Sequence, residues 1–271
     1  MNNMDKIEVY YFSGTGNSLH GSQGLAKRLP NVSLLPIASL LKKDKVSALG
    51  AVVGFIFPVH LSTIPIFLKD FIKKVDLSSA EYIFAVATRI GTEHSAFFEI
   101  EKILRKKGKH LSSSFNLNMP SNDPKFNFTP AGGYEMKELE KEVERQLEVI
   151  SRAIDNKEQL PIKDKNYLTR IPFVRLLSPL VTLLDGIQQN FYADDKCAGC
   201  GICKKVCLSG KIKMSEGRPI WQKEIKCFKC YACLNYCPNQ AVQIKNFTEK
   251  KGRYSHPYAS ADEIARQKFD M

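Results

Sequence analysis

Cysteine is missing from the first 196 residues of this 271-residue chain, and all eight cysteines lie between Cys197 and Cys237. The chain also lacks a basic segment followed by an apolar run near its start, so we expect no signal peptide. The apolar run Leu176–Leu184 contains Pro179 and is too short for a membrane span. These absences predict a cytoplasmic protein with no membrane span, and they argue against a disulfide framework.

The cysteines instead follow a ligand pattern. They form two runs in which two, two and three residues separate successive members: Cys197, Cys200, Cys203 and Cys207, then Cys227, Cys230, Cys233 and Cys237. This is the spacing of bacterial two-cluster ferredoxins, in which the fourth cysteine of each run reaches the other cluster. We therefore predict that one [4Fe–4S] cluster is held by Cys197, Cys200, Cys203 and Cys237. The other is held by Cys207, Cys227, Cys230 and Cys233.

Zinc is the alternative occupant of such a cysteine-rich region. Zinc sites are usually tetrahedral and assembled from separated pairs of cysteines, which leaves the third cysteine of each run without a role. One departure from the ferredoxin pattern is Leu208, which stands where proline is usual. Proline is not a ligand, so we expect only a local effect on the turn.

The rest of the chain divides into four parts. Strand and helix patterns alternate through residues 1–160, which predicts an α/β domain with a parallel sheet. Prolines break residues 161–190 into short pieces of a helical connector, the cysteine domain occupies 191–245, and a tail follows over 246–271. The expected strands cover 7–12, 32–37, 51–57, 82–87 and 110–119, and the expected helices 19–29, 64–75, 95–107 and 134–156.

A candidate anion loop follows the first expected strand and opens the first helix. It consists of Ser13, Gly14, Thr15, Gly16, Asn17 and Ser18. Its backbone N–H groups, its hydroxyls and the helix dipole would all favour a phosphate. No lysine ends the loop, so it is not a nucleoside-triphosphate loop. The alternative is an ordinary tight turn between strand and helix.

Several segments resemble, in order, the fused flavodoxin-like and two-[4Fe–4S] ferredoxin proteins of anaerobes. They are FSGTGNS at 12–18, FPVHLSTIP at 57–65, Met119-Pro120-Ser121-Asn122, the two cysteine runs, and Gly252-Arg253-Tyr254-Ser255-His256-Pro257. The resemblance implies a flavodoxin-like doubly wound parallel sheet that binds FMN, joined to a small α+β bacterial-ferredoxin domain. It implies electron transport by an iron–sulfur flavoprotein, without indicating a substrate.

In the flavodoxin-like fold the ligand lies beyond the carboxyl ends of the strands. The resemblance therefore implies that two loops flank the flavin: Pro58, Val59, His60 and Leu61 after the third strand, and Thr88, Arg89, Ile90 and Gly91 after the fourth. His60 would contact the flavin, or it is an exposed loop histidine. Arg89 would raise the flavin potential as a nearby cation, or it points outward to a partner.

The net charge of +12 would suit a nucleic acid or an ordinary solvated surface. Two clusters and one FMN would lower it to about +6. We therefore predict a redox partner protein with an acidic docking surface, and no nucleic acid.

Three functions remain open from the sequence. The first is electron transfer between the clusters and FMN. The second is a flavin-dependent reductase of a small molecule bound near His60, Arg89 and Asn122. The third is a docking adaptor that carries clusters but no flavin. No residues resemble a catalytic triad, so we predict no catalytic residue, and the sequence leaves open whether the protein is an oxidoreductase enzyme.

Overall fold

The computed structural model describes residues 6–60, 63–90, 95–122, 133–160, 162 and 190–269, with the backbone alone described for 133–135. The N-terminal part is a five-stranded parallel sheet in the order β2-β1-β3-β4-β5. Its strands are β1 (Ile7–Tyr11), β2 (Val32–Pro36), β3 (Val52–Pro58), β4 (Tyr82–Arg89) and β5 (Ser113–Asn118). This order is that of the flavodoxin-like fold, so the predicted fold class is confirmed.

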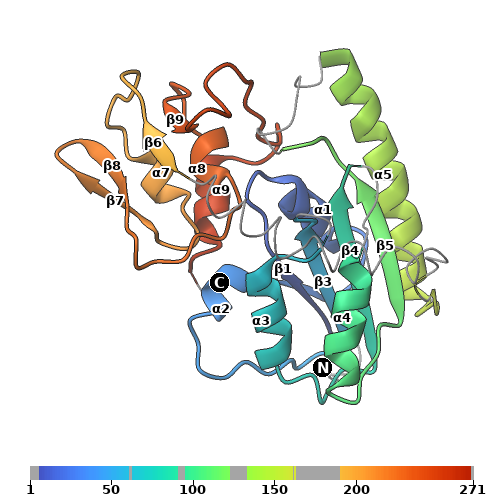
Figure 1. Cartoon of the computed structure of the whole chain (residues 1–271). Coiled ribbons are helices and arrows are strands. Elements are labelled where there is room, and N and C mark those ends of the chain that lie inside the picture. The colour runs from blue at the N-terminus through green and yellow to red at the C-terminus, as the bar shows by residue number, and fades with distance from the viewer. Residues whose placement is uncertain are drawn as a thin grey trace.

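Helices cover both faces of the sheet (Figure 1). The helices are α1 (Asn17–Ala26), α2 (Ile37–Leu40), α3 (Ile66–Lys74), α4 (Ala96–Arg105) and α5 (Gly133–Asp155). Helix α1 packs beside α5, and α3 packs beside α4. The short helix α2 was not expected from the sequence.

The central strands are buried on both faces, as their continuous apolar runs predict. The Phe84 ring of β4 leaves room only for glycine at position 54 in β3, because a Cβ there would lie 2.2 Å from the ring. Strand β4 extends two residues beyond its expected end. Thr88 and Arg89 continue the parallel ladder with β5 opposite Leu117 and Asn118, which gives these polar residues strand geometry.

The cysteine domain contains two short two-stranded antiparallel sheets and two single-turn helices. Strand β6 (Phe191–Ala193) pairs antiparallel with β9 (Val242–Ile244), and β7 (Ile212–Ser215) pairs antiparallel with β8 (Arg218–Trp221). Helix α7 (Ile202–Lys205) lies within the first cysteine run, and α8 (Ala232–Asn235) lies within the second. The tail adds α9 (Ala261–Arg266), which a Ser260–Glu263 capping box starts.

The tail and the cysteine domain share the main hydrophobic core of the sheet domain. Val206, Leu208, Ala232, Ala259 and Ile264 belong to the same buried cluster as the central strands. The two parts are therefore joined by packing as well as by the chain. No helix in the described ranges has the length and apolar character that a membrane crossing needs.

Candidate functional site

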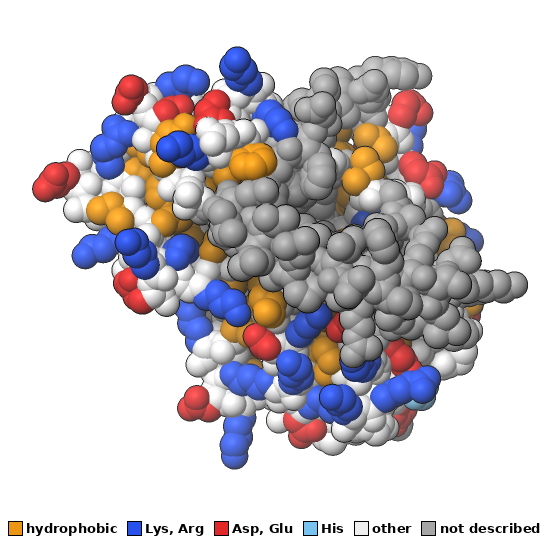
Figure 2. Space-filling model, in the orientation of Figure 1, with side chains coloured by type: hydrophobic (Ala, Val, Ile, Leu, Met, Phe, Trp, Pro, Cys, Tyr) orange, Lys and Arg blue, Asp and Glu red, His pale blue; other side chains and the backbone are white. Residues whose placement is uncertain are grey.

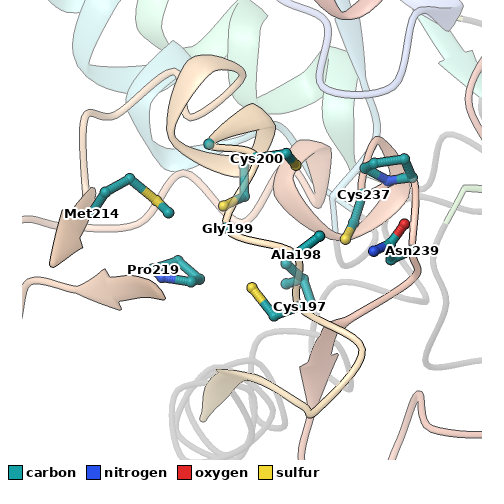
Figure 3. A pocket seen from close by; sticks show the side chains of 12 residues that line it. Cys197, Ala198, Gly199, Cys200, Met214, Pro219, Cys237 and Asn239 are labelled. Carbon is teal, nitrogen blue, oxygen red and sulfur yellow. The ribbon is translucent and has the colours of Figure 1, made fainter. Parts of the chain in front are cut away.

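The first site is a small cavity that four cysteines line. They are Cys197, Cys200, Cys203 and Cys237. Figure 3 shows Cys197 and Cys237 around this space, with Met214 of β7 and Pro219 of β8 nearby. Cys200 is exposed and Cys203 is buried, so one edge of the cavity lies at the molecular surface.

The second site is a cavity of similar size, lined by Cys207, Cys227, Cys230 and Cys233. Aromatic side chains, among them Trp221 and Phe228, complete its wall. The structure thus brings the members of each predicted set around one cavity, and it places the fourth cysteine of each run with the other run.

The two cysteine runs have the same backbone geometry. Gly199 and Gly201 adopt positive φ angles of 68° and 75°, and the equivalent residues of the second run, Lys229 and Tyr231, adopt 56° and 55°. Left-handed geometry is costly for residues with a Cβ. Its recurrence at matching positions indicates that the loop must curve in this way to turn its thiols inward.

The thiols suit a cationic cluster better than they suit isolation. Burial raises the pKa of Cys203 to about 11, and it also raises the pKa of Cys227, Cys230 and Cys233. Four thiolates gathered around one cavity would repel one another without positive charge among them, and iron centres supply that charge. The Ala241 N–H donates to Cys237 Sγ at 3.2 Å, as ligating sulfurs commonly accept from the backbone.

The anion loop is buried beneath the C-terminal tail. Ser13, Thr15, Asn17 and Ser18 are each at most 5% exposed. Gln267 holds the Ser13 backbone from both sides: its Oε1 accepts from Ser13 N–H at 2.9 Å, and its Nε2 donates to Ser13 O at 2.8 Å.

Three further contacts fix the loop. The His256 N–H donates to Thr15 O at 2.8 Å. The Tyr254 hydroxyl donates to Asn17 Oδ1 at 2.9 Å, and Asn122 Nδ2 donates to Thr15 Oγ1 at 2.6 Å. The loop is therefore preorganised by residues from the tail and from the segment after β5.

The loop retains donors for an anion. Within the described part of the chain, no hydrogen bond engages the backbone N–H groups of Gly14, Thr15, Asn17 or Ser18. Buried N–H groups normally find an acceptor. A phosphate at the start of α1 would accept from such groups and would also be favoured by the helix dipole. The loop thus fits a phosphate group.

The anion loop also touches the second cysteine cavity. A Cβ at Gly14 would lie 2.2 Å from the Cys230 carbonyl oxygen and 2.7 Å from Cys230 Cβ. Phe228, which lines the same cavity, packs on Phe12 and Phe67 of the sheet domain with ring centroids 5.9 and 4.6 Å away. The backbone contact at Gly14 and the aromatic packing of Phe228 together hold the second cavity against the anion loop.

The residues expected to flank the flavin have varied surroundings. Pro58, Thr88 and Arg89 lie in the ends of β3 and β4 rather than in loops, because the parallel ladder continues through them. Thr88 Oγ1 lies 2.7 Å from Ser18 Oγ, which links this strand end to the anion loop. Val59 and His60 are half-buried, and Ile90 is 68% exposed.

Leu61 and Gly91, and all of the expected connector except residues 162 and 190, lie outside the described residues. The His60 backbone pairs with Thr63, and its ring lies 6.4 Å from that of Phe67. The contact roles expected for His60 and Arg89 toward a flavin stay predictions.

Sequence reasoning assigned no role to Tyr254, His256 and Gln267. The segment containing Tyr254 and His256 contributed to the family resemblance, but it gave no hint of its contacts. Gln267 lies 254 residues from its partner Ser13, and no local pattern identifies such a pair.

A partly buried ionisable cluster anchors His256. Its ring stacks on His20 of α1 with centroids 4.2 Å apart and an interplanar angle of 25°. Glu140 of α5 lies beside both rings, with its carboxylate oxygens 2.8 Å from His20 Nε2 and 4.0 Å from His256 Nε2. Nitrogen lone pairs lie in the ring planes, so stacked rings do not converge on one metal ion. We interpret the cluster as an anchor for the tail.

This anchor predicts a pH effect on the tail. Burial, with a smaller contribution from His20, lowers the pKa of His256 from 6.5 to about 3. Between these values the unfolded chain binds more protons than the folded one, so stability rises with pH. Lowering the pH from 7.5 to 5.5 should loosen the tail by on the order of 1 kcal/mol. Hydrogen exchange of tail peptides, corrected for intrinsic rates, would measure this loss of protection.

His256→Gln should remove this pH dependence, whereas the same change at the exposed His110 should leave it intact. Equal protection of the wild-type tail at pH 7.5 and 5.5 would show that protonation of His256 does not govern the tail.

Residues 196–242 match the family of 4Fe-4S dicluster domains. The match covers both cysteine runs, and it identifies this part of the chain as an iron–sulfur domain. The match does not give the number of bound clusters or the cofactor of the sheet domain. No curated protein matches the chain.

Solved structures show only distant likeness. A Bacteroides uniformis protein described as a flavoprotein is 19% identical over 44% of this chain and 93% of its own, with a TM-score of 0.36. Rubredoxin oxygen:oxidoreductase of Desulfovibrio gigas is 13% identical over 57% of this chain and 37% of its own, with a TM-score of 0.33. The Trp repressor binding protein of Bacillus subtilis is 13% identical over 56% of this chain and 96% of its own, with a TM-score of 0.34. These low scores add nothing to the strand order described above.

Proposed function

We propose that the chain is an electron-transfer protein that exchanges electrons between two [4Fe–4S] clusters and FMN, to or from a redox partner. The observation that carries the proposal is the contact between Gly14 of the anion loop and Cys230 of the second cysteine cavity. This backbone contact supports the proposal, because a phosphate bound at the loop and a cluster held by Cys230 would lie in adjoining parts of one structure.

The residues that would hold the clusters are the two sets of four cysteines. Cys203 and Cys207 are less than 9% exposed, and apolar side chains line much of both cavities, which would shield the clusters from water except at the edge beside the exposed Cys200. The exchange of fourth cysteines ties the two cavities together, since Cys207 and Cys237 each reach across.

The residues that would hold FMN are those of the anion loop. The free N–H groups would bind the phosphate, while Asn122, Tyr254 and Gln267 keep the loop in one conformation. When bound, iron–sulfur clusters exchange one electron each and a flavin exchanges two, so this combination suits exchange between one- and two-electron carriers.

The flavin-free adaptor is a second candidate, and the tail favours it. Gln267 already engages the Ser13 N–H, and the Gly16 N–H is engaged by Ser13 Oγ at 3.1 Å. A tail seated on the loop in this way would leave fewer donors for a phosphate. Addition of FMN to the anaerobically purified protein separates these candidates, because an adaptor would bind none.

Rapid mixing of the full, cofactor-loaded chain with reduced methyl viologen tests electron exchange. We expect cluster absorbance to bleach first and flavin absorbance to follow at a rate independent of protein concentration. A flavin phase that accelerates with protein concentration would mean that electrons pass between molecules and would contradict the proposal.

A further inference from the structure

Four lysines from three distant segments gather where the tail meets the cysteine domain. They are Lys42 after α2, Lys204 and Lys205 of α7, and Lys268 after α9, and we call them the lysine patch. Lys268 Nζ donates to Lys205 O at 2.6 Å. In Figure 2, basic side chains are visible on this face around the place where Figure 1 marks the C-terminus and α2.

Within the described residues, one ion pair links the patch to an acidic side chain. Asp262 forms an ion pair with Lys205. Burial lowers the pKa of Lys268, and the positive charges of Lys42, Lys204 and Lys205 lower it further, so these three lysines lie close enough to repel the Lys268 ammonium group. Gathered like charges destabilise the free protein and attract an oppositely charged surface.

The patch also has an apolar contact point and lies near a cluster ligand. Phe269 is 65% exposed, and Lys268 Nζ lies 6.0 Å from the centre of its ring. Exposed aromatic residues among charged ones are typical of protein interfaces. Lys205, whose carbonyl oxygen accepts from Lys268, lies two residues before Cys207, which lines the second cavity.

We propose that the lysine patch docks an acidic one-electron carrier protein above the cluster held by Cys207, Cys227, Cys230 and Cys233. This inference rests on the proposed function. In the transfer the carrier loses one electron and the cluster gains it, with no bond made or broken and no proton moved. The same cluster adjoins Gly14, so electrons would enter beside the flavin rather than at the exposed Cys200.

The test compares charge reversal on the patch with the same reversal elsewhere, in the full chain loaded with clusters and FMN. Lys42→Glu/Lys204→Glu changes two exposed patch residues. Lys102→Glu/Lys106→Glu makes the same charge change on exposed positions in and just after α4. Cluster reduction is followed by rapid mixing with a reduced acidic two-[4Fe–4S] ferredoxin, and separately with reduced methyl viologen.

At low ionic strength we expect the patch variant to accept electrons from the ferredoxin at least about tenfold more slowly than wild type. The α4 variant should stay near the wild-type rate, and the wild-type rate should fall with added salt. Equal rates in patch variant and wild type, or an equal loss in both variants, would overturn the docking surface while viologen still reduces the clusters. If viologen reduced the clusters of neither the wild type nor the two variants, the proposed function itself would be overturned.

Discussion

Replacing Gly14 with alanine will separate the anion loop from the second cysteine cavity. The new Cβ would lie 2.2 Å from the Cys230 carbonyl oxygen and 3.0 Å from its carbonyl carbon. Both are backbone atoms and cannot rotate away as a flexible side chain would. We expect overpacking to destabilise the protein by about 1–3 kcal/mol and to abolish fast reduction of the flavin. Thermal unfolding and rapid mixing with reduced viologen measure the two effects.

Gly108→Ala provides the control for Gly14→Ala. Gly108 has a φ of +68°, but a Cβ there would meet nothing within 4 Å. Its replacement should cost only the strain of left-handed geometry, about 1–2 kcal/mol, and leave flavin reduction unchanged. If the flavin of Gly14→Ala were reduced at the wild-type rate, the contact with Cys230 would not couple the two sites.

Alanine at Cys200 and alanine at Cys230 should each lower the iron content from about eight to about four per chain, with opposite consequences for the flavin. Cys230 adjoins the anion loop, so its loss should stop flavin reduction by viologen. Cys200 lies at the exposed edge of the first cavity, so its loss should leave that reduction intact.

Iron analysis and absorbance spectroscopy on the two anaerobically purified variants measure both quantities. The variants are matched in chemistry and differ only in which cavity they open. Equal loss of flavin reduction in both would contradict a path that runs through the second cavity alone. Retention of eight irons in either variant would contradict the assigned ligand set.

The sheet was predictable because each central strand is a short apolar run that only a strand buried on both faces explains. The cysteine sets were predictable in outline because the spacing within each run limits which thiols share a cavity. The extension of β4 through Thr88 and Arg89 was missed, since pairing with β5, rather than the apolar pattern of β4 itself, sets where the strand ends.

The contacts between the tail and the anion loop are the largest feature that the sequence did not predict. Tyr254 and His256 each reach the anion loop through one hydrogen bond and Gln267 through two, all across more than 230 residues of sequence. Taken alone, polar residues of this kind are expected to be exposed to solvent. Their burial follows from the packing of Ala259 and Ile264 into the main core, which only the assembled fold reveals.

The most direct test of the central claim is the content of iron, acid-labile sulfide and flavin per chain, measured on protein purified without air. We predict about eight iron, about eight sulfide and one FMN. Eight iron with no flavin, even after FMN is added, would contradict the flavin half of the claim. Zinc in place of iron would contradict the claim as a whole.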